Sequence, residues 1–404
     1  MVKKIKTEQL QLGMYIHDFN CGWLDHPFLK SRLKVTDEKL IEKIESYGIC
    51  EVYIDTQKGI DIADAPTKDE IKREIQSRLR DVYVTEVETD CEVPIKEEIV
   101  RAKAIRQEAK ETIKSIMNDI RFGRNIERGK VEEIVDKMAV SIFRNQDALL
   151  SLSKIRKIDE YTYAHSVSVC ALMLAFGKHL GFKSQELREA GIGAMLHDIG
   201  KIKVPLEIIN KRGTLSDEEI KLVREHVRFG CAMLEETSGI SETSILVAAE
   251  HHERVDGMGY PNGLSGDDIS RYGKAAAIID VYDSMTSNRS YRNRIPATDA
   301  LGKLFEWSKL NFDGRLVQEF VRCIGIYPIG SLVYLESGLL AVVISHGIKS
   351  LLHPIIRVIF DTKKNSYIRP YDIDLAQESD ESGGDMIISY ASPDQWNVTP
   401  EIYL

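Results

Sequence analysis

The sequence predicts a mainly α-helical protein, in which a helical bundle lies between a small α+β module at the N-terminus and a short β-rich segment at the C-terminus. Three patterns support this prediction. Apolar residues recur at helical spacing over most of residues 131–327, alternating β-branched runs follow after residue 328, and short β-like runs surround one helical stretch within residues 1–62. With 404 residues the chain is long enough to form two or three domains.

The composition limits the partners and the compartment. A net charge of -9 disfavours duplex nucleic acid, because neutralising its phosphates requires a basic face. No apolar stretch reaches the roughly 20 residues of a membrane span, and no apolar segment follows the basic start of the chain as in a secretory signal. The six cysteines lie far apart and form no CxxC pair. We therefore expect a cytoplasmic protein without membrane contact, for which a small phosphorylated ligand remains a suitable partner.

Residues 1–62 are expected to form the α+β module. They contain β-like runs at 13–17 and 51–55 around a helical stretch at 36–47. The next segment, residues 63–93, is polar and without a clear pattern, so it is interpreted as a linker.

Residues 94–130 are expected to form a connecting helix with heptad spacing. The apolar positions are Ile99, Ala102, Ile105, Ala109, Ile113, Ile116 and Ile120, whose mean spacing is 3.5 residues. Two interpretations follow from so few repeats. The helix packs on its own domain, or its apolar seam pairs with a second copy in a homodimer.

Residues 131–327 are expected to form the helical domain. The periodicity predicts helices at 132–152, 162–180, 186–197, 217–236, 245–252 and 275–285. A capping box from Ser216 to Glu219 opens the fourth of them. Residues 328–404 form the β-rich extension, with strands expected at 331–335, 341–344 and 355–360.

Histidines of the helical domain predict a metal site. Five of the ten lie between residues 165 and 252, namely His165, His197, His226, His251 and His252. Alone, His165 and His226 fit packed core histidines better than metal ligands, and His197-Asp198 fits a core histidine beside an N-cap aspartate. The intervals between them are each about one helical hairpin long, so successive helices of one bundle can bring them to a common centre. No cysteine lies at ligand spacing, which disfavours a thiolate zinc site.

The adjacent pair His251-His252 is the stronger indication. Neighbouring residues on a helix point about 100° apart, so the pair can serve two different metals. Asp280 and Asp283 lie one turn apart on an apolar helix, where unpaired carboxylates are costly and a nearby cation removes that cost. Asp283 also fits a surface acid at the helix end.

Cations near these residues suggest phosphate binding. Lys201 follows Asp198 on the same side of a turn, where it can hold a phosphate oxygen beside the metals. Arg289 and Arg292 follow the Asp280 helix and fit either phosphate clamps or solvated surface arginines. The glycine-rich loop 253–266 abuts the histidine pair, as expected for a loop that approaches a ligand closely.

Two motifs together resemble the signatures of the HD-GYP family. They are His197-Asp198-Ile-Gly-Lys201 and His251-His252-Glu-x-x-Asp256-Gly-x-Gly259-Tyr260-Pro261. The resemblance covers roughly residues 140–325. The first 60 residues are similar to the small module often found before such domains, through residues 13–16 and 23–28, and the β-rich segment is similar to C-terminal extensions of some members. The resemblance implies an HD-type helical bundle.

The resemblance also implies an activity. HD-GYP proteins are bacterial phosphodiesterases that hydrolyse cyclic di-GMP to linear pGpG and often onward to GMP, usually with iron or manganese. Carried over by position, the family's metal ligands are His165, His197, Asp198, His226, His251, His252 and Asp280. The resemblance further implies that Lys201 is the catalytic lysine and that Asp283, Arg289 and Arg292 contact the substrate. In the family the loop matching Gly259-Tyr260-Pro261 is associated with the site and with docking of diguanylate cyclase domains, which are therefore expected partners. Some members hold a third metal with a glutamate where this chain has Tyr161, so two metals are expected.

The expected mechanism uses two divalent ions about 3.5 to 4 Å apart, bridged by Asp198 and by a water that they acidify to a hydroxide. This hydroxide would attack phosphorus in line with the leaving 3′ oxygen, while Lys201 stabilises the developing charge. Two alternatives stay open at this point. One is a metal-bearing receptor that binds cyclic di-GMP with little hydrolysis, and the other is a phosphohydrolase of another nucleotide.

Overall fold

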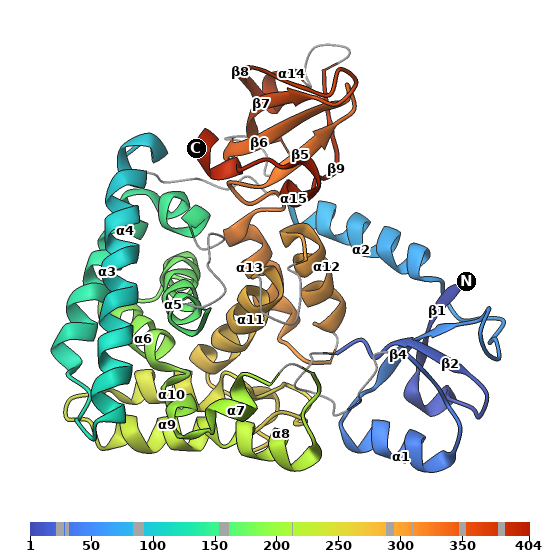
Figure 1. The fold of residues 1–404 in the computed structure, drawn as a ribbon, viewed down its shortest axis with the longest axis horizontal. Helices are drawn as coiled ribbons and strands as arrows, with labels where there is room; N and C mark the ends of the chain where they lie inside the picture. Colours follow the sequence, from blue (N-terminus) through green and yellow to red (C-terminus); the bar gives the residue numbers. More distant parts are fainter. Residues whose placement is uncertain are drawn as a thin grey trace.

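A helical bundle forms the centre of the molecule, with one sheet beside it and another at its end (Figure 1). This computed structural model describes the chain except for residues 22–27, 29–31, 84–92, 153–160, 212, 288–294, 309, 347–352 and 379–383. The arrangement confirms the predicted fold class. Within the described ranges, no helix is at once long enough and apolar enough to cross a membrane.

The N-terminal module is a four-stranded antiparallel sheet covered by one helix. Its elements are β1 (Val2–Lys6), β2 (Tyr15–Asp18), β3 (Leu33–Lys34), α1 (Glu38–Ser46) and β4 (Glu51–Asp55), and the strand order is β1-β4-β2-β3. Asp37 caps α1 by accepting a hydrogen bond from the Leu40 amide at 3.0 Å. Ile16 and Ile54 face each other across β2 and β4 and are fully buried in a core that includes Ile44 of α1. The α+β prediction is therefore confirmed.

The segment interpreted as a linker contains a helix that the sequence reading missed. α2 (Lys68–Tyr83) packs against α12 (Ala297–Trp307) and α13 (Gly314–Ile324). Its apolar stripe is narrow, because only polar and charged residues stand between Ile75, Leu79 and Val82. Such a stripe is difficult to recognise in the sequence of a polar segment, although its residues pack into the core of the bundle.

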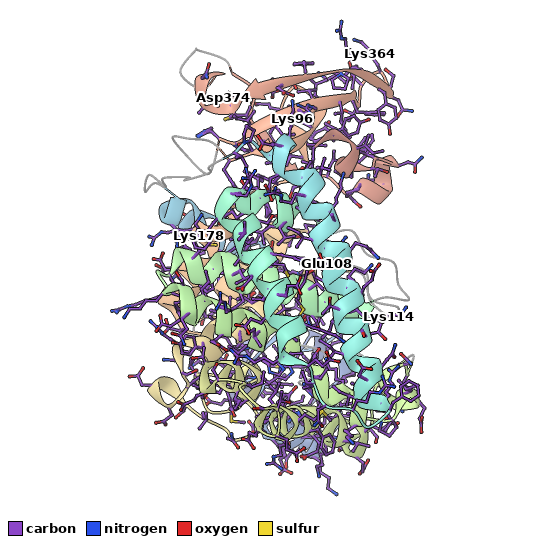
Figure 2. All side chains as sticks on the ribbon, turned by 90° about the vertical axis from the view of Figure 1, so that its left-hand side faces the viewer. Lys96, Glu108, Lys114, Lys178, Lys364 and Asp374 are labelled. Carbon is purple, nitrogen blue, oxygen red and sulfur yellow. The ribbon has the colours of Figure 1, made fainter. Side chains whose placement is uncertain are left out.

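The apolar heptad stripe of the connecting helix packs against other helices of the same chain. α3 (Ile95–Arg121) runs along the outside of the bundle beside α4 (Arg128–Leu152), with Lys96 near the C-terminal sheet and Lys114 towards the other end (Figure 2). The stripe residues Ile99, Ala102, Ile105, Ala109, Ile113 and Ile116 are all buried in one core. This confirms the interpretation as an amphipathic helix packed on its own domain. A homodimer would have to form through a surface other than this buried stripe.

The helices that carry or directly precede the predicted ligands follow one another around this core. They are α5 (Tyr161–His179), α6 (Ser184–Leu196), α8 (Asp217–Arg224), α9 (His226–Glu235), α10 (Glu242–Glu250) and α11 (Arg271–Thr286), with the 3-10 turn η3 (Ile199–Lys203) after α6. The predicted capping box is confirmed, since the Ser216 amide donates to Glu219 Oε2 at 2.7 Å and the Glu219 amide donates to Ser216 Oγ at 3.2 Å. The single helix expected at 217–236 is instead two helices that meet at Glu225.

The C-terminal segment is a five-stranded antiparallel sheet in the order β8-β7-β6-β5-β9. Its strands are β5 (Leu332–Leu335), β6 (Leu339–Ser345), β7 (Ile355–Asp361), β8 (Ser366–Asp374) and β9 (Ile387–Tyr390). Both faces of its central strands are buried, because Val333 and Ala341 belong to one small core and Leu332 and Val342 to another. The β-rich prediction is confirmed, although β8 and β9 were not predicted.

Candidate metal centre

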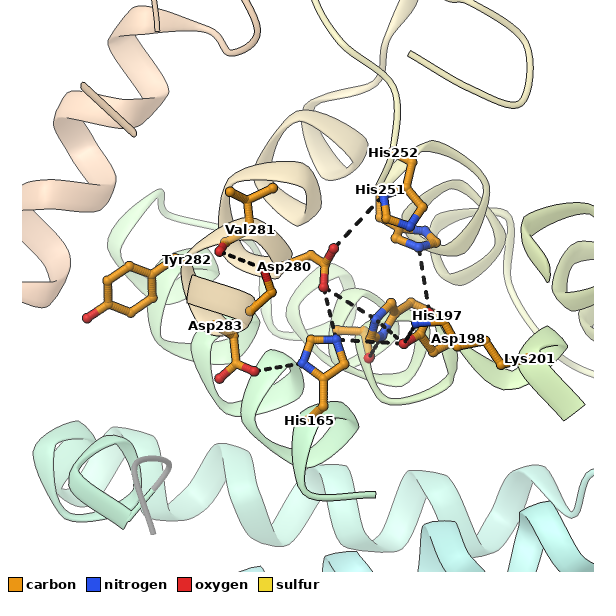
Figure 3. A network of polar contacts seen from close by, with 12 residues as sticks. His165, His197, Asp198, Lys201, His251, His252, Asp280, Val281, Tyr282 and Asp283 are labelled. Carbon is orange, nitrogen blue, oxygen red and sulfur yellow. Dashed lines mark hydrogen bonds and ion pairs between the residues drawn. The ribbon is translucent and has the colours of Figure 1, made fainter. Parts of the chain in front are cut away.

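The seven residues predicted as metal ligands converge from different helices on one buried centre. Figure 3 labels all of them except His226. His165 lies on α5, His197 and Asp198 follow α6, His226 begins α9, His251 and His252 follow α10, and Asp280 lies on α11. Their nitrogen and oxygen atoms form three overlapping groups, each with its ligand atoms within 4.8 Å of one another: His165, His197 and Asp280; His197, Asp198 and His251; His226, His251 and His252. Convergence from such distant positions does not fit isolated core histidines.

Asp198 lies between two sides of this centre. Its Oδ2 atom is 3.4 Å from His197 Nε2 and 3.7 Å from His165 Nε2. Its Oδ1 atom is 3.3 Å from His226 Nε2 and 4.0 Å from His251 Nε2. The two oxygens of this carboxylate, which is 1% exposed, therefore face different sets of imidazoles.

The ends of three helices orient the imidazoles. The Nδ1 atoms of His197, His226 and His251 lie 2.8, 2.7 and 2.7 Å from the carbonyl oxygens of Ala194, Val223 and Ala248. A carbonyl oxygen only accepts, so each Nδ1 carries the proton and donates it, which leaves the Nε2 lone pair facing the centre. The last carbonyls of a helix lack intrahelical partners, and this explains why the ligands stand at helix ends. The negative ends of these helices also favour a nearby cation.

Several ligand atoms lack a partner that a cation would provide. Among the described residues, the buried Nε2 atoms of His197 and His252 and the buried Oδ1 of Asp198 make no hydrogen bond. Burying such atoms without compensation is costly. A donor set of imidazole nitrogens and carboxylate oxygens suits a divalent first-row metal, so the residues present fit the predicted ions.

The pKa values of three of these residues are shifted in the direction that metal binding requires. Burial alone raises the pKa of Asp198, but the Lys201 ammonium, 2.5 Å from Oδ2, and the His197 ring hold that pKa well below its usual range. Burial and the neighbouring His197 ring lower the pKa of His251 to about 3, and burial lowers the pKa of His252 as well. The carboxylate is thus charged and these two imidazoles are neutral at neutral pH, as metal ligation requires.

Asp283 lies behind His165 and not at the open side of the centre. Its Oδ2 accepts a hydrogen bond from His165 Nδ1 at 2.6 Å, and the residue is 2% exposed. On the other side of the same ring, His165 Nε2 is 2.9 Å from Asp280 Oδ1. Burial opposes a charge on His165, but the hydrogen bonds to Asp280 and Asp283 outweigh it and raise the pKa. This geometry suits an orienting carboxylate better than the substrate contact that the resemblance implies.

We expect Asp283→Asn to weaken metal binding by roughly 10- to 100-fold, which is the usual cost of losing a carboxylate that orients a ligating histidine. The amide keeps the shape but not the charge that fixes the His165 ring. Metal titration of the depleted variant measures this effect. The exposed Asp299→Asn on α12 is the matched control and should bind metal as the wild type does. Equal affinities of both variants would rule out the orienting role.

The Gly259-Tyr260-Pro261 loop folds over the histidine pair. The Tyr260 ring stacks on His252 with centroids 4.5 Å apart, and the Arg224 guanidinium lies 4.8 Å from the Tyr260 centroid. A Cβ atom at Gly259 would lie 2.4 Å from the Arg254 amide nitrogen, so this close approach of two backbone segments requires glycine. The Glu253 carboxylate accepts hydrogen bonds from the amides of Asn262 and Leu264 at 2.8 and 2.9 Å and so holds the loop.

A cleft opens beside the metal centre, and sequence reasoning identified only part of it. Its walls include Tyr47, Arg224, His251, His252, Tyr260 and Trp307. The sequence analysis did not predict Arg224 as a site residue, although its positive charge two residues before the predicted ligand His226 could have indicated that role. The predicted clamps Arg289 and Arg292 lie outside the described residues.

Two family models match the chain. One, described as an HD domain, matches residues 145–316, and the other, described as a domain of unknown function (DUF3391), matches residues 2–131. The first therefore contains all seven predicted ligands. The second extends from the N-terminal sheet through α3.

Similar proteins were found among curated sequences and solved structures. A cyclic di-GMP phosphodiesterase of Pseudomonas aeruginosa is 36% identical over 398 residues, which cover 98% of this chain and 94% of that protein. A 3′3′-cGAMP-specific phosphodiesterase of Vibrio cholerae is 36% identical over 124 residues, which cover 30% of this chain and 24% of that protein. An HDG“Y”P protein from Bdellovibrio bacteriovorus aligns with a TM-score of 0.47 and 18% identity, over 79% of this chain and 98% of that one. The similarity to the Pseudomonas protein includes both flanking segments as well as the bundle.

Proposed function

This chain belongs to the HD-GYP family of phosphodiesterases, and from that membership we propose that it hydrolyses cyclic di-GMP to linear pGpG at a centre of two iron or manganese ions. The observation that carries the proposal is the convergence of the seven predicted ligands, with their nitrogen and oxygen atoms, on one buried centre beside a cleft. The full-length similarity to a cyclic di-GMP phosphodiesterase supports the choice of substrate. The absence of any CxxC pair and the free thiols Cys170 and Cys323 support a cytoplasmic location.

The ligands divide into two sets that share Asp198. His165, His197 and Asp280 would hold one ion, and His226, His251 and His252 the other, with one oxygen of Asp198 towards each. Bound there, two divalent ions would acidify a water near neutral pH and stabilise the charge on the phosphoryl oxygens.

The chain's own residues supply orientation and charge. Lys201 is partly exposed and lies against Asp198, so its ammonium can hold a phosphoryl oxygen beside the ligands. Arg224 adds positive charge in the cleft, where it can fix a substrate phosphate. The predicted phosphate-holding roles of Arg289 and Arg292 stay predictions. The loop at 259–261 likewise stays a predicted docking site for diguanylate cyclase domains, with Met258 exposed beside it.

Removing the metals should abolish turnover of cyclic di-GMP. The centre offers imidazole nitrogens, which bind first-row transition metals in preference to Mg²⁺. We therefore expect Fe²⁺ or Mn²⁺ to restore activity to chelated protein and Mg²⁺ to restore little. The measurement is chromatography of products from anaerobically purified protein, with metal content determined on the same samples.

The same assay separates the alternatives. Linear pGpG as the first product supports the proposal, and later GMP shows that hydrolysis continues. Activity that survives complete metal removal would contradict it. Binding of cyclic di-GMP without product would instead favour a receptor. Preferred cleavage of 3′3′-cGAMP would reassign the substrate, and it is included because a Vibrio relative specific for it is similar over 124 residues.

A further inference from the structure

We propose that the N-terminal module completes the substrate-binding cleft, with Tyr47 as the residue that positions the part of the cyclic dinucleotide extending away from the metals. This inference rests on the proposed function. It gives the module a direct role in substrate recognition, although the module lies outside the HD domain match at residues 145–316.

Tyr47 lines the same cleft as the metal-binding pair. It directly follows α1 of the module, and its half-buried ring shares the cleft with His251, His252, Arg224 and Tyr260. Two tyrosine rings and a guanidinium plane around one cleft are the groups on which nucleobases stack. A guanine base of the substrate is therefore a fitting occupant of this wall.

The Tyr47 side chain is fixed by the catalytic domain. Its hydroxyl donates to Asp217 Oδ1 at 2.9 Å, and Lys43 Nζ donates to Oδ2 of the same carboxylate at 3.0 Å. Burial and this hydrogen bond raise the pKa of Tyr47 to about 12, so the hydroxyl stays a donor at neutral pH. Asp217 begins α8 and Arg224 ends it, so one short helix holds the module's tyrosine and carries the guanidinium of the cleft.

The module is held against the bundle by a second, buried polar network. The Glu306 carboxylate on α12 accepts from Tyr53 Oη at 2.8 Å, Lys4 Nζ lies 2.6 Å from it, and its side chain is 9% exposed. Next to it, Trp307 Nε1 donates to Asn20 Oδ1 at 3.0 Å, and Trp307 itself lines the cleft. A buried, paired network of this kind defines one orientation between its two partners. Tyr47 therefore has a defined position in the wall of the cleft.

This arrangement predicts an effect on substrate affinity that is separate from the chemistry. Tyr47 makes none of the described contacts of the metal ligands, so its loss should leave the reacting centre unchanged. Tyr47 and the histidine pair line one cleft, so a cyclic dinucleotide with one phosphate at the predicted ligands places its remaining parts along this wall. A small diester such as bis(p-nitrophenyl) phosphate lacks the second base and should not sense the change.

The test compares Tyr47→Ala, Tyr47→Phe and Tyr15→Ala in the full-length, manganese-loaded protein. For Tyr47→Ala we expect KM for cyclic di-GMP to rise roughly 5- to 150-fold, the range for losing one base stack, with kcat within about twofold. Tyr47→Phe keeps the ring and should restore most of the affinity. Tyr15→Ala removes a half-buried ring elsewhere in the module and serves as the matched control. All three should cleave bis(p-nitrophenyl) phosphate as the wild type does.

An unchanged KM in Tyr47→Ala overturns the inference, and so does a lower KM, which would mean that the ring obstructs the cleft. Equal losses on both substrates also overturn it, because they indicate structural damage. Equilibrium binding of cyclic di-GMP to the same proteins separates this inference from the proposed function. If the wild type binds but does not cleave, the proposed function fails, and the ratio of the two dissociation constants still decides the role of Tyr47. If the wild type does not bind, both fail.

Discussion

Asp198→Asn is expected to eliminate turnover of cyclic di-GMP and to leave the fold intact. The two oxygens of Asp198 lie towards different sets of imidazoles, with Oδ2 3.4 Å from His197 Nε2 and Oδ1 3.3 Å from His226 Nε2. An amide has the same shape but offers one oxygen and no charge, so it cannot serve both sides. Because a ligand is lost and not merely misoriented, the fall in kcat/KM should exceed the roughly 10- to 100-fold cost typical of residues behind the ligands.

Three measurements on Asp198→Asn check this expectation. We expect kcat/KM to fall by at least about a thousandfold, as happens when a residue acting in the transition state is removed. Metal content should fall below that of the wild type. Metal-dependent stabilisation, about 2.7 kcal/mol when the metal is at 100 times its dissociation constant, should shrink in thermal unfolding. Asp299→Asn is again the control. A variant that retains a full metal complement and a tenth of the activity would remove Asp198 from its bridging role.

Residue type and spacing indicated side chains that the structure brings together, and the family resemblance assigned them as metal ligands, which stays a prediction. Imidazole and carboxylate are scarce in an apolar bundle, so seven of them at hairpin intervals carry chemical information before any coordinates are known. The roles behind the ligands were not predictable in the same way. That Ala194 accepts from His197, or that Asp283 accepts from His165, depends on where a helix ends and how two helices cross. Local periodicity in the sequence predicts neither of these two hydrogen bonds.

Contacts between distant segments were the least predictable part. The Tyr47 side chain is held at the cleft because Asp217, 170 residues later, accepts a hydrogen bond from its hydroxyl. Glu306 joins the module through Lys4 and Tyr53, and none of these three residues belongs to a motif. The helix α2 was not predicted for a related reason. Its few apolar residues are explained only by their packing against α12 and α13, which lie far away in the sequence. Local patterns predict elements, while docking depends on complementary side chains far apart in sequence.

Gly200→Ala is expected to damage the centre without touching a ligand. Gly200 lies in η3, where its backbone packs directly on the start of α9. A Cβ atom there would lie 1.9 Å from the His226 carbonyl oxygen and 2.4 Å from the Gly230 amide nitrogen. Both obstacles are backbone, so α9 must move, and with it His226, whose Nε2 atom lies 3.3 Å from Asp198. This is a physical reason for the glycine between Asp198 and Lys201.

The expected cost has two parts. Overpacking should lower the free energy of unfolding by about 1 to 3 kcal/mol, measured by denaturant titration. Displacing His226 should weaken metal binding at its side of the centre by more than about tenfold, measured by titration of the depleted protein. Gly230→Ala tests the opposite face of the same contact. Its Cβ atom would meet Gly200 at 3.4 Å, an ordinary contact, and alanine suits its helix, so stability should rise by about 0.4 to 1 kcal/mol. If both variants behave alike, the close approach of η3 and α9 does not position His226.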